Sequence, residues 1–274
     1  MFTAYFDESE AATVYFVSGW VATVEVWSEF TLAWNAVLAS EPSIKYLRHN
    51  EAKGLKGEFA GWTDADVARK IDTLVDVICA HEMHGLNVGV RTTTWGEAFK
   101  SDVLSKKQVT SVLKFTHPYQ ACFHAAVAGV LQRQLEKGFS SEVVNFVFDE
   151  QKGLLRHSID LFAQFKPTFP KQSLAIAGEI VSGDDKSTPA LQAADLLCGQ
   201  IATALASGKP DPAYQRLVTC HEVAKGTAYP PKFEQTDAMV KLLGAVWTEK
   251  KMLDSLLALM ETDNSSPADA SAKK

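Results

Sequence analysis

Short apolar runs alternate along the chain with longer segments in which apolar residues recur every three or four positions. Aromatic and β-branched residues are dense at positions 2–6 and 13–23, and the polar segment DESEAA separates them. This pattern predicts a β-hairpin. Similar short runs predict strands at 86–91, 143–148 and 174–181. Five strands are therefore expected.

The segments between these strands mostly have the helical period. Local signals mark their ends: Thr63 precedes an acidic first turn, Pro189 follows a threonine, and Gly138 closes a long segment. The expected helices span 26–39, 63–82, 118–138, 154–165 and 188–206, with one or two more between 214 and 260, while 44–62 is expected to be a loop or a short helix.

This order of elements predicts an α/β fold in which helices wrap a mixed sheet. We expect one domain with helices appended at its C-terminus. The last residues, ETDNSSPADASAKK, are small and polar, so a disordered tail is expected at 263–274.

Composition and charge narrow the class of protein. The chain has 274 residues, of which 46% are hydrophobic, enough for a sizeable core. Its net charge of −6 argues against a protein that coats nucleic acid by bulk charge. A nuclease stays compatible with it, since bound Mg²⁺ inverts the field around site carboxylates. Two basic groups, each also typical of a solvated surface, are Lys45, Arg48, Lys53 and Lys56, and Lys100, Lys106, Lys107 and Lys114.

The N-terminal segment and the cysteines favour a cytoplasmic protein. MFTAYFDESE has no basic region before an apolar run, and the apolar stretches are short for a bilayer. We therefore expect no membrane association. The four cysteines are far apart without a C-x-x-C pair, which predicts reduced thiols, three of them in apolar helical patterns. Cys220 and His221 lack the second paired element that a zinc site needs.

Three aspartates lie where a fold would favour apolar residues. Asp7 follows FTAYF, Asp149 follows VVNFVF, and Asp195 interrupts PALQAADLLCGQIATAL. An aspartate after a strand is also typical of turns. Asp195 is beyond the first turn of its helix and cannot cap it. A buried carboxylate there must be neutral, bound to metal, or paired with a distant arginine or with Lys186.

The three aspartates predict a metal site if they converge. Asp7 and Asp149 would meet at one edge of the sheet if their strands are neighbours. Oxygen ligands without thiolates or paired imidazoles favour Mg²⁺ or Mn²⁺ over zinc. Clustered carboxylates of this kind suit two-metal phosphoryl transfer.

Four segments resemble one family. YFDESE, NEAKG, FVFDE and SGDDKSTPALQAADLLCG are together similar to the bacterial and phage family catalogued as domain of unknown function 3800, of the RNase H-like superfamily. The resemblance covers residues 1–208, with a helical insertion at about 25–83, and leaves 209–262 as a C-terminal helical extension. It implies an RNase H-like five-stranded mixed sheet.

The resemblance also implies the site residues. Asp7, Asp149 and Asp195 would be metal ligands and catalytic, and Glu51 of NEAKG would be the fourth carboxylate. In many RNase H-like nucleases a glutamate on the helix after the third strand has that role, and here this helix offers only Glu136. Substrate phosphates are expected at Lys53 and Lys186, and nucleic acid also at Lys106 and Lys107. Strand alternation turns Glu8 and Glu150 to the opposite face.

The sequence thus predicts a Mg²⁺- or Mn²⁺-dependent nuclease that hydrolyses phosphodiester bonds. The alternative is a non-catalytic RNase H-like module that binds nucleic acid or a partner protein and keeps its acids as a structural network. A strand-transfer protein is disfavoured, because no separate DNA-reading domain is evident.

Overall fold

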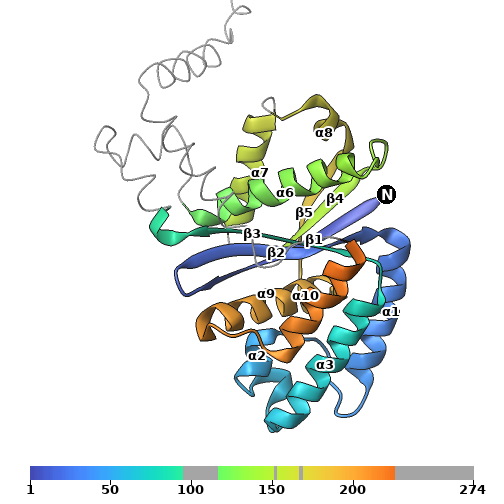
Figure 1. The fold of residues 1–274 in the computed structure, drawn as a ribbon, viewed down its shortest axis with the longest axis vertical. Coiled ribbons are helices and arrows are strands. Elements are labelled where there is room, and N and C mark those ends of the chain that lie inside the picture. The colour runs from blue at the N-terminus through green and yellow to red at the C-terminus, as the bar shows by residue number, and fades with distance from the viewer. Residues whose placement is uncertain (95–116, 151–152, 167–168, 226–274) are drawn as a thin grey trace, which may run out of the picture.

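A five-stranded mixed sheet forms the centre of the molecule (Figure 1). The computed structural model describes residues 1–94, 117–150, 153–166 and 169–225. The strands are β1 (Phe2–Ala11), β2 (Val14–Thr23), β3 (His84–Arg91), β4 (Val144–Asp149) and β5 (Ala177–Gly183), in the order β3-β2-β1-β4-β5. β2 is antiparallel to β1 and β3, and β4 is parallel to β1 and β5. The expected α/β fold with a mixed sheet is confirmed.

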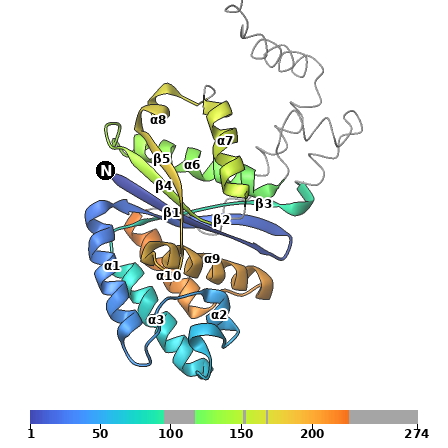
Figure 2. The same cartoon turned by 180° about the vertical axis from the view of Figure 1, so that it is seen from behind.

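Helices cover both faces of the sheet, as both views show (Figures 1 and 2). One face carries α6 (Pro118–Glu136), α7 (Leu154–Phe165) and α8 (Lys171–Ile176). The other carries α1 (Val24–Ala39), α2 (His49–Lys53), η1 (Gly57–Phe59), α3 (Asp64–Ala80), α9 (Pro189–Ser207) and α10 (Pro212–Lys225). The site described below lies on the α9 face.

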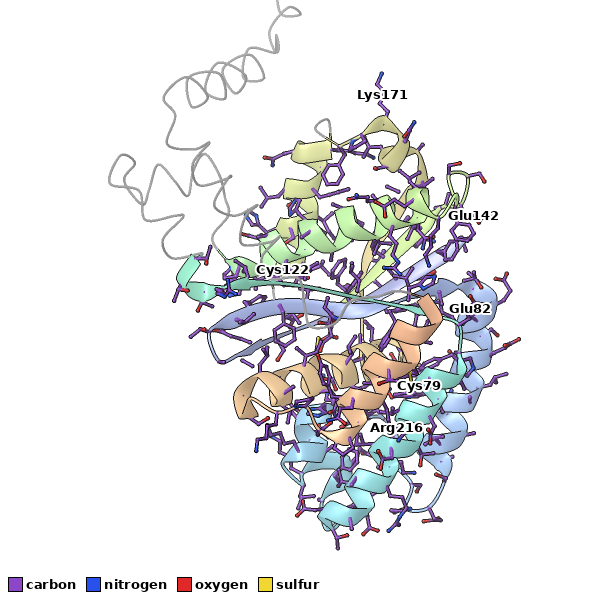
Figure 3. All side chains as sticks on the ribbon, viewed as in Figure 1. Cys79, Glu82, Cys122, Glu142, Lys171 and Arg216 are labelled. Carbon is purple, nitrogen blue, oxygen red and sulfur yellow. A yellow bond between two sulfur atoms is a disulfide. The ribbon has the colours of Figure 1, made fainter. Side chains whose placement is uncertain are left out.

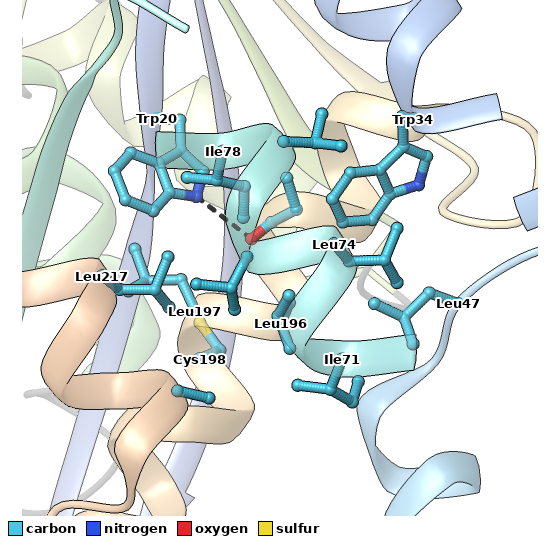
Figure 4. Packing of buried hydrophobic residues seen from close by; sticks show 14 of the residues in the cluster. Trp20, Trp34, Leu47, Ile71, Leu74, Ile78, Leu196, Leu197, Cys198 and Leu217 are labelled. Carbon is cyan, nitrogen blue, oxygen red and sulfur yellow. Dashed lines mark hydrogen bonds between the residues drawn. The ribbon is translucent and has the colours of Figure 1, made fainter. Parts of the chain in front are cut away.

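Two buried clusters hold these layers together. On the α6 face, Phe6 of β1 and Phe148 of β4 stack with ring centroids 5.2 Å apart. On the α9 face, Trp20 and Trp34 are fully buried, and the Trp20 indole donates to the carbonyl of Ala193 at 3.1 Å (Figure 4). The alternation along β1 buries Phe2, Ala4 and Phe6 toward α6, so Asp7 points to the α9 side.

Two strands differ from expectation. β1 continues through the polar segment DESEA, whose backbone pairs with β2 from Asp7↔Ser18 to Ala11↔Val14. Ladder hydrogen bonds need no apolar side chain, so the polar residues lengthen the strand instead of forming its turn. Residues 174–176, expected to begin a strand, belong to α8, which follows Pro170. A short apolar run fits either period, and the strand begins only at Ala177.

The cysteine prediction is wrong for one pair. Cys79 of α3 and Cys220 of α10 form a disulfide, with their Cα atoms 5.6 Å apart. α10 packs along α3, and Cys79 and Arg216 lie where the two helices meet (Figure 3). Arg216 forms ion pairs with Asp72, at 3.1 Å, and with Asp76. This packing brings together thiols 141 residues apart, which their spacing in sequence does not reveal. The buried thiols, Cys122 and Cys198, agree with the expected reduced core.

The C-terminal extension is described only as far as α10, which packs on α3 and α9. The expected tail at 263–274 and the remaining expected helix lie outside the described residues. Within the described residues, no helix is long and apolar enough to cross a membrane.

Candidate functional site

The register of the sheet brings two of the predicted aspartates together. β1 and β4 are parallel neighbours with Phe6 opposite Phe148, so Asp7 and Asp149 come next on adjacent strands and point to the same face. Asp7 lies just past the part of β1 that pairs on both sides, because its last residues pair with β2 alone.

The long helix α9 supplies the third aspartate. The Cys198 thiol donates to the carbonyl oxygen of Asp7 at 3.2 Å. Asp195 precedes Cys198 by three residues and therefore shares its helix face. Asp7, Asp149 and Asp195, which we call the acid cluster, thus come from β1, β4 and α9.

The carboxylates of the acid cluster repel one another. Burial, together with the charges of Glu8, Asp195 and Asp149, raises the pKa of Asp7 well above its usual value. Burial raises the pKa of Asp195 to about 7, although its carboxylate accepts a hydrogen bond from the His49 backbone N–H at 2.6 Å. Burial and the charge of Asp185 raise the pKa of Asp149, while Arg48 lowers it. A bound cation would relieve this repulsion.

An ion pair that the sequence analysis missed lies beside the acid cluster. Arg48 donates to both carboxylate oxygens of Asp185, at 2.5 and 2.7 Å, and Asp185 is only 7% exposed. The hydrogen bond with Asp185 raises the pKa of Arg48, and Asp149 and Glu51 add to the effect. The expected arginine partner for an acid therefore exists, but it pairs with Asp185 and leaves Asp195 to the His49 N–H.

Gln192 fixes the segments that carry this ion pair. Its side-chain oxygen accepts hydrogen bonds from the Trp34 indole at 2.9 Å and from the Leu47 N–H at 3.1 Å. Its nitrogen donates to the Asp185 carbonyl at 2.9 Å. One buried amide thus joins α9 to α1, to the segment before α2 and to the loop before α9. Gln192 is the first residue of the segment QAAD, which ends at Asp195. No charge pattern in the sequence indicates that this uncharged amide joins the three segments.

Glu51 of α2 has its local partners in η1. Its carboxylate accepts from the Glu58 N–H at 3.3 Å. It also lies against Gly57, where a side chain would collide with it and where φ is +57°. Its charge contributes to the raised pKa of Arg48, so Glu51 lies near that guanidinium.

The other candidate for the fourth carboxylate lies far from the acid cluster. Burial and the charges of Glu8, Asp7 and Asp149 raise the pKa of Tyr119, so the first turn of α6 is near the acids. Glu136 is the last residue of that helix and accepts from Gln132 at 2.8 Å. At about 1.5 Å per residue, α6 carries it about 25 Å from Tyr119.

The predicted lysines have different surroundings. The Lys186 ammonium lies 5.1 Å from the centre of the Tyr46 ring, and exposed Lys53 lines a cavity beside α2. Lys106 and Lys107 lie outside the described residues. Glu8 alternates with Asp7 toward the α6 face, and Glu150 is exposed.

The acid cluster has the donor chemistry of a hard-cation site, since it consists of carboxylate oxygens. Within the described ranges, no group of three or more His, Cys, Asp or Glu side chains is already arranged to hold a metal ion. The carboxylates would have to move closer to ligate one.

No protein-family model matches the sequence, and no curated protein matches it either.

Proposed function

We propose that this chain is an RNase H-like nuclease that hydrolyses phosphodiester bonds with Mg²⁺ or Mn²⁺. The observation that supports this most is the convergence of Asp7, Asp149 and Asp195 from two adjacent parallel strands and a helix. Carboxylates that raise each other's pKa are costly for the fold, and a divalent cation would offset that cost.

Each residue would have a distinct role. Asp7, central to the acid cluster, would hold both ions, with Asp195 on one and Asp149 and Glu51 on the other. Two cations held there would supply an activated water and stabilise the leaving oxygen. The chain itself holds Asp7 through the Cys198 thiol and orients Asp195 through the His49 N–H.

Positive groups beside the acids would receive the substrate phosphates. Lys186 precedes α9, the helix that carries Asp195, and Lys53 ends α2, the helix that begins at His49. Arg48 is hydrogen-bonded to Asp185, and its positive charge also lowers the pKa of Asp149. The expected nucleic-acid contacts at Lys106 and Lys107 stay predictions.

A second candidate is a non-catalytic RNase H-like module that binds nucleic acid or a partner protein. The Arg48–Asp185 pair and the His49 N–H on Asp195 favour it, because they partly compensate the acids without a metal. The acids would then form a structural network.

A cleavage assay distinguishes the nuclease from the non-catalytic module. Labelled single- and double-stranded DNA and RNA are incubated with Mg²⁺ or Mn²⁺ and with wild type, Asp7→Asn or Glu10→Gln, the last an exposed acid of the same strand. A nuclease loses turnover by orders of magnitude in Asp7→Asn and keeps it in Glu10→Gln, while Asp7→Asn still binds nucleic acid. Salt-sensitive binding without any metal-dependent cleavage would favour the non-catalytic module.

The fourth carboxylate has its own test. Glu51→Gln is expected to abolish cleavage, whereas Glu136→Gln leaves it intact because Glu136 is at the far end of α6. The reverse result would move the ligand to α6.

A further inference from the structure

A cavity of about 360 Å³ opens beside the acid cluster, between α2, α3, α9 and α10. Val67 and Ile71 of α3 and Ala213 of α10 give it apolar walls, and Thr203 of α9 and Lys53 of α2 add polar groups. Ligand pockets typically measure about 300–1,000 Å³. This cavity is at the small end of that range, suited to a single nucleoside and too small for a base pair.

His49 connects the cavity to the acid cluster. The His49 N–H donates to the Asp195 carboxylate at 2.6 Å, and His49 is one of the residues that line the cavity. The ring packs so closely on Gly199 that any side chain at that position would collide with it. The His49 ring is therefore held in place against α9, in a residue that contacts both the cavity and Asp195. Unpaired bases stack on aromatic rings of this kind.

Three carboxylates are among the polar side chains that line the cavity, together with those of Lys53, Gln200 and Thr203. Asp64, Asp72 and Asp211 contribute carboxylates, and Asp72 already accepts from Arg216. Asp211 accepts the Tyr214 N–H at 2.8 Å. Ionised carboxylates accept only, so a ligand that donates from amino groups complements them.

We propose that the cavity binds an unpaired nucleobase with an exocyclic amino group, belonging to the nucleotide next to the phosphate at the acid cluster. This inference rests on the proposed nuclease function, and it names the substrate as single-stranded nucleic acid. The base stacks on His49 and Val67, and its amino edge donates to Asp64 and Thr203. Guanine, with two adjacent donors on one edge, fits best, and uracil, which has no amino group, fits worst.

The test uses uncharged nucleosides in EDTA, so that it depends neither on metal nor on turnover. Guanosine, cytidine and uridine are titrated into the full chain by calorimetry. Guanosine is expected to bind with a Kd of about 1 mM, and uridine at least threefold more weakly.

Two matched variants locate the binding. Ala68 and Ala65 are both exposed on α3, but only Ala68 lines the cavity. Ala68→Phe should fill the space and weaken guanosine binding at least tenfold, while Ala65→Phe leaves it unchanged. Asp64→Asn, a mild change at the exposed start of α3, should reduce the preference for guanosine over uridine and serves if Ala68→Phe does not fold.

The outcomes distinguish this inference from the proposed function. The cavity proposal would be overturned if no saturable nucleoside binding were found, if guanosine and uridine bound equally, or if Ala68→Phe bound guanosine like the wild type. This holds even if metal-dependent cleavage is found. Nucleoside binding with these preferences but no cleavage would keep the cavity and reject the nuclease. Binding of spermidine in place of nucleosides would assign the cavity to an organic cation and overturn the proposal.

Discussion

Asp195 is held in a position that favours its protonated form. Its pKa in the fold is about 7 because of burial, against an ordinary value of 3.8. Between these values the folded state binds more protons than the unfolded state, so the contribution of Asp195 to stability is complete below about pH 4 and is lost as pH rises through about 7. One pKa unit corresponds to about 1.4 kcal/mol, so the loss is at most about 4 kcal/mol.

Asp195→Asn should therefore flatten the pH dependence of stability. In EDTA, the free energy of unfolding of the wild type is expected to fall between pH 4.5 and 7.5 more steeply than that of the variant, and the variant should be at least as stable at pH 7.5. Urea unfolding at several pH values measures this. Asp160→Asn, at an exposed carboxyl on α7, is the control and should keep the wild-type slope. A loss of several kcal/mol at neutral pH in Asp195→Asn would mean a structural ion pair.

Arg48 is expected to stabilise the fold at neutral pH, whereas the ionised Asp195 carboxylate is expected to destabilise it. Arg48→Met would leave the Asp185 carboxylate, only 7% exposed, without its two hydrogen bonds. The expected loss is about 2–3 kcal/mol, because an uncompensated buried acid is costly. Arg69→Met removes an exposed pair with Asp66 and should cost less than about 1 kcal/mol. Equal losses in urea unfolding would contradict the importance assigned to Arg48.

At the scale of elements, the helices were the best predicted from sequence. α7 was predicted at its observed bounds, and α9 and α3 begin where Pro189 and Thr63 indicate. These signals work because caps and prolines act through neighbouring backbone groups. α8 was missed because a six-residue helix leaves too few turns for its period to be read.

The candidate site was predictable only in part, for a related reason. Asp7, Asp149 and Asp195 each contrast with their own apolar segment, which a sequence shows directly. The Arg48–Asp185 pair joins residues 137 apart, and its partners look like ordinary polar residues of two loops. Gln192 has to fold against Trp34 and Leu47 before that pairing exists.

The attachment of α10 to α3 gives a prediction about these two elements. The Cys79–Cys220 disulfide closes a long loop, and disulfides of this kind stabilise by about 2–4 kcal/mol. Dithiothreitol should lower the melting temperature of the wild type toward that of Cys79→Ala/Cys220→Ala. The double variant itself should not respond to the reductant. Identical melting with and without dithiothreitol in the wild type would show that the bond does not form in solution.

The acid cluster and the cavity lie on the same side of the sheet, and α9 contributes to both. α9 lies against β1 and β2 and also packs on α1, α2 and α10. A cation bound by Asp7 on the sheet and Asp195 on α9 would therefore connect the sheet to the entire helical layer. Its binding energy would add to the free energy of unfolding of the whole chain.

Manganese should accordingly raise the melting temperature of the wild type by several degrees. A ligand that binds only the folded state at 100 times its Kd stabilises by about 2.7 kcal/mol. Asp7→Asn should show no such shift, because it removes the carboxylate common to both ions, whereas Glu10→Gln, an exposed acid on the same strand, should shift like the wild type. Calcium is expected to stabilise without supporting cleavage, since its looser coordination holds the reacting oxygens less well. Thermal melts in EDTA, Mn²⁺ and Ca²⁺ measure the shifts, and the cleavage assay repeated in Ca²⁺ measures the turnover. Equal shifts in wild type and Asp7→Asn would mean that the cation binds elsewhere, and the acid cluster would then have to be interpreted as a structural network held by Arg48 and the His49 N–H.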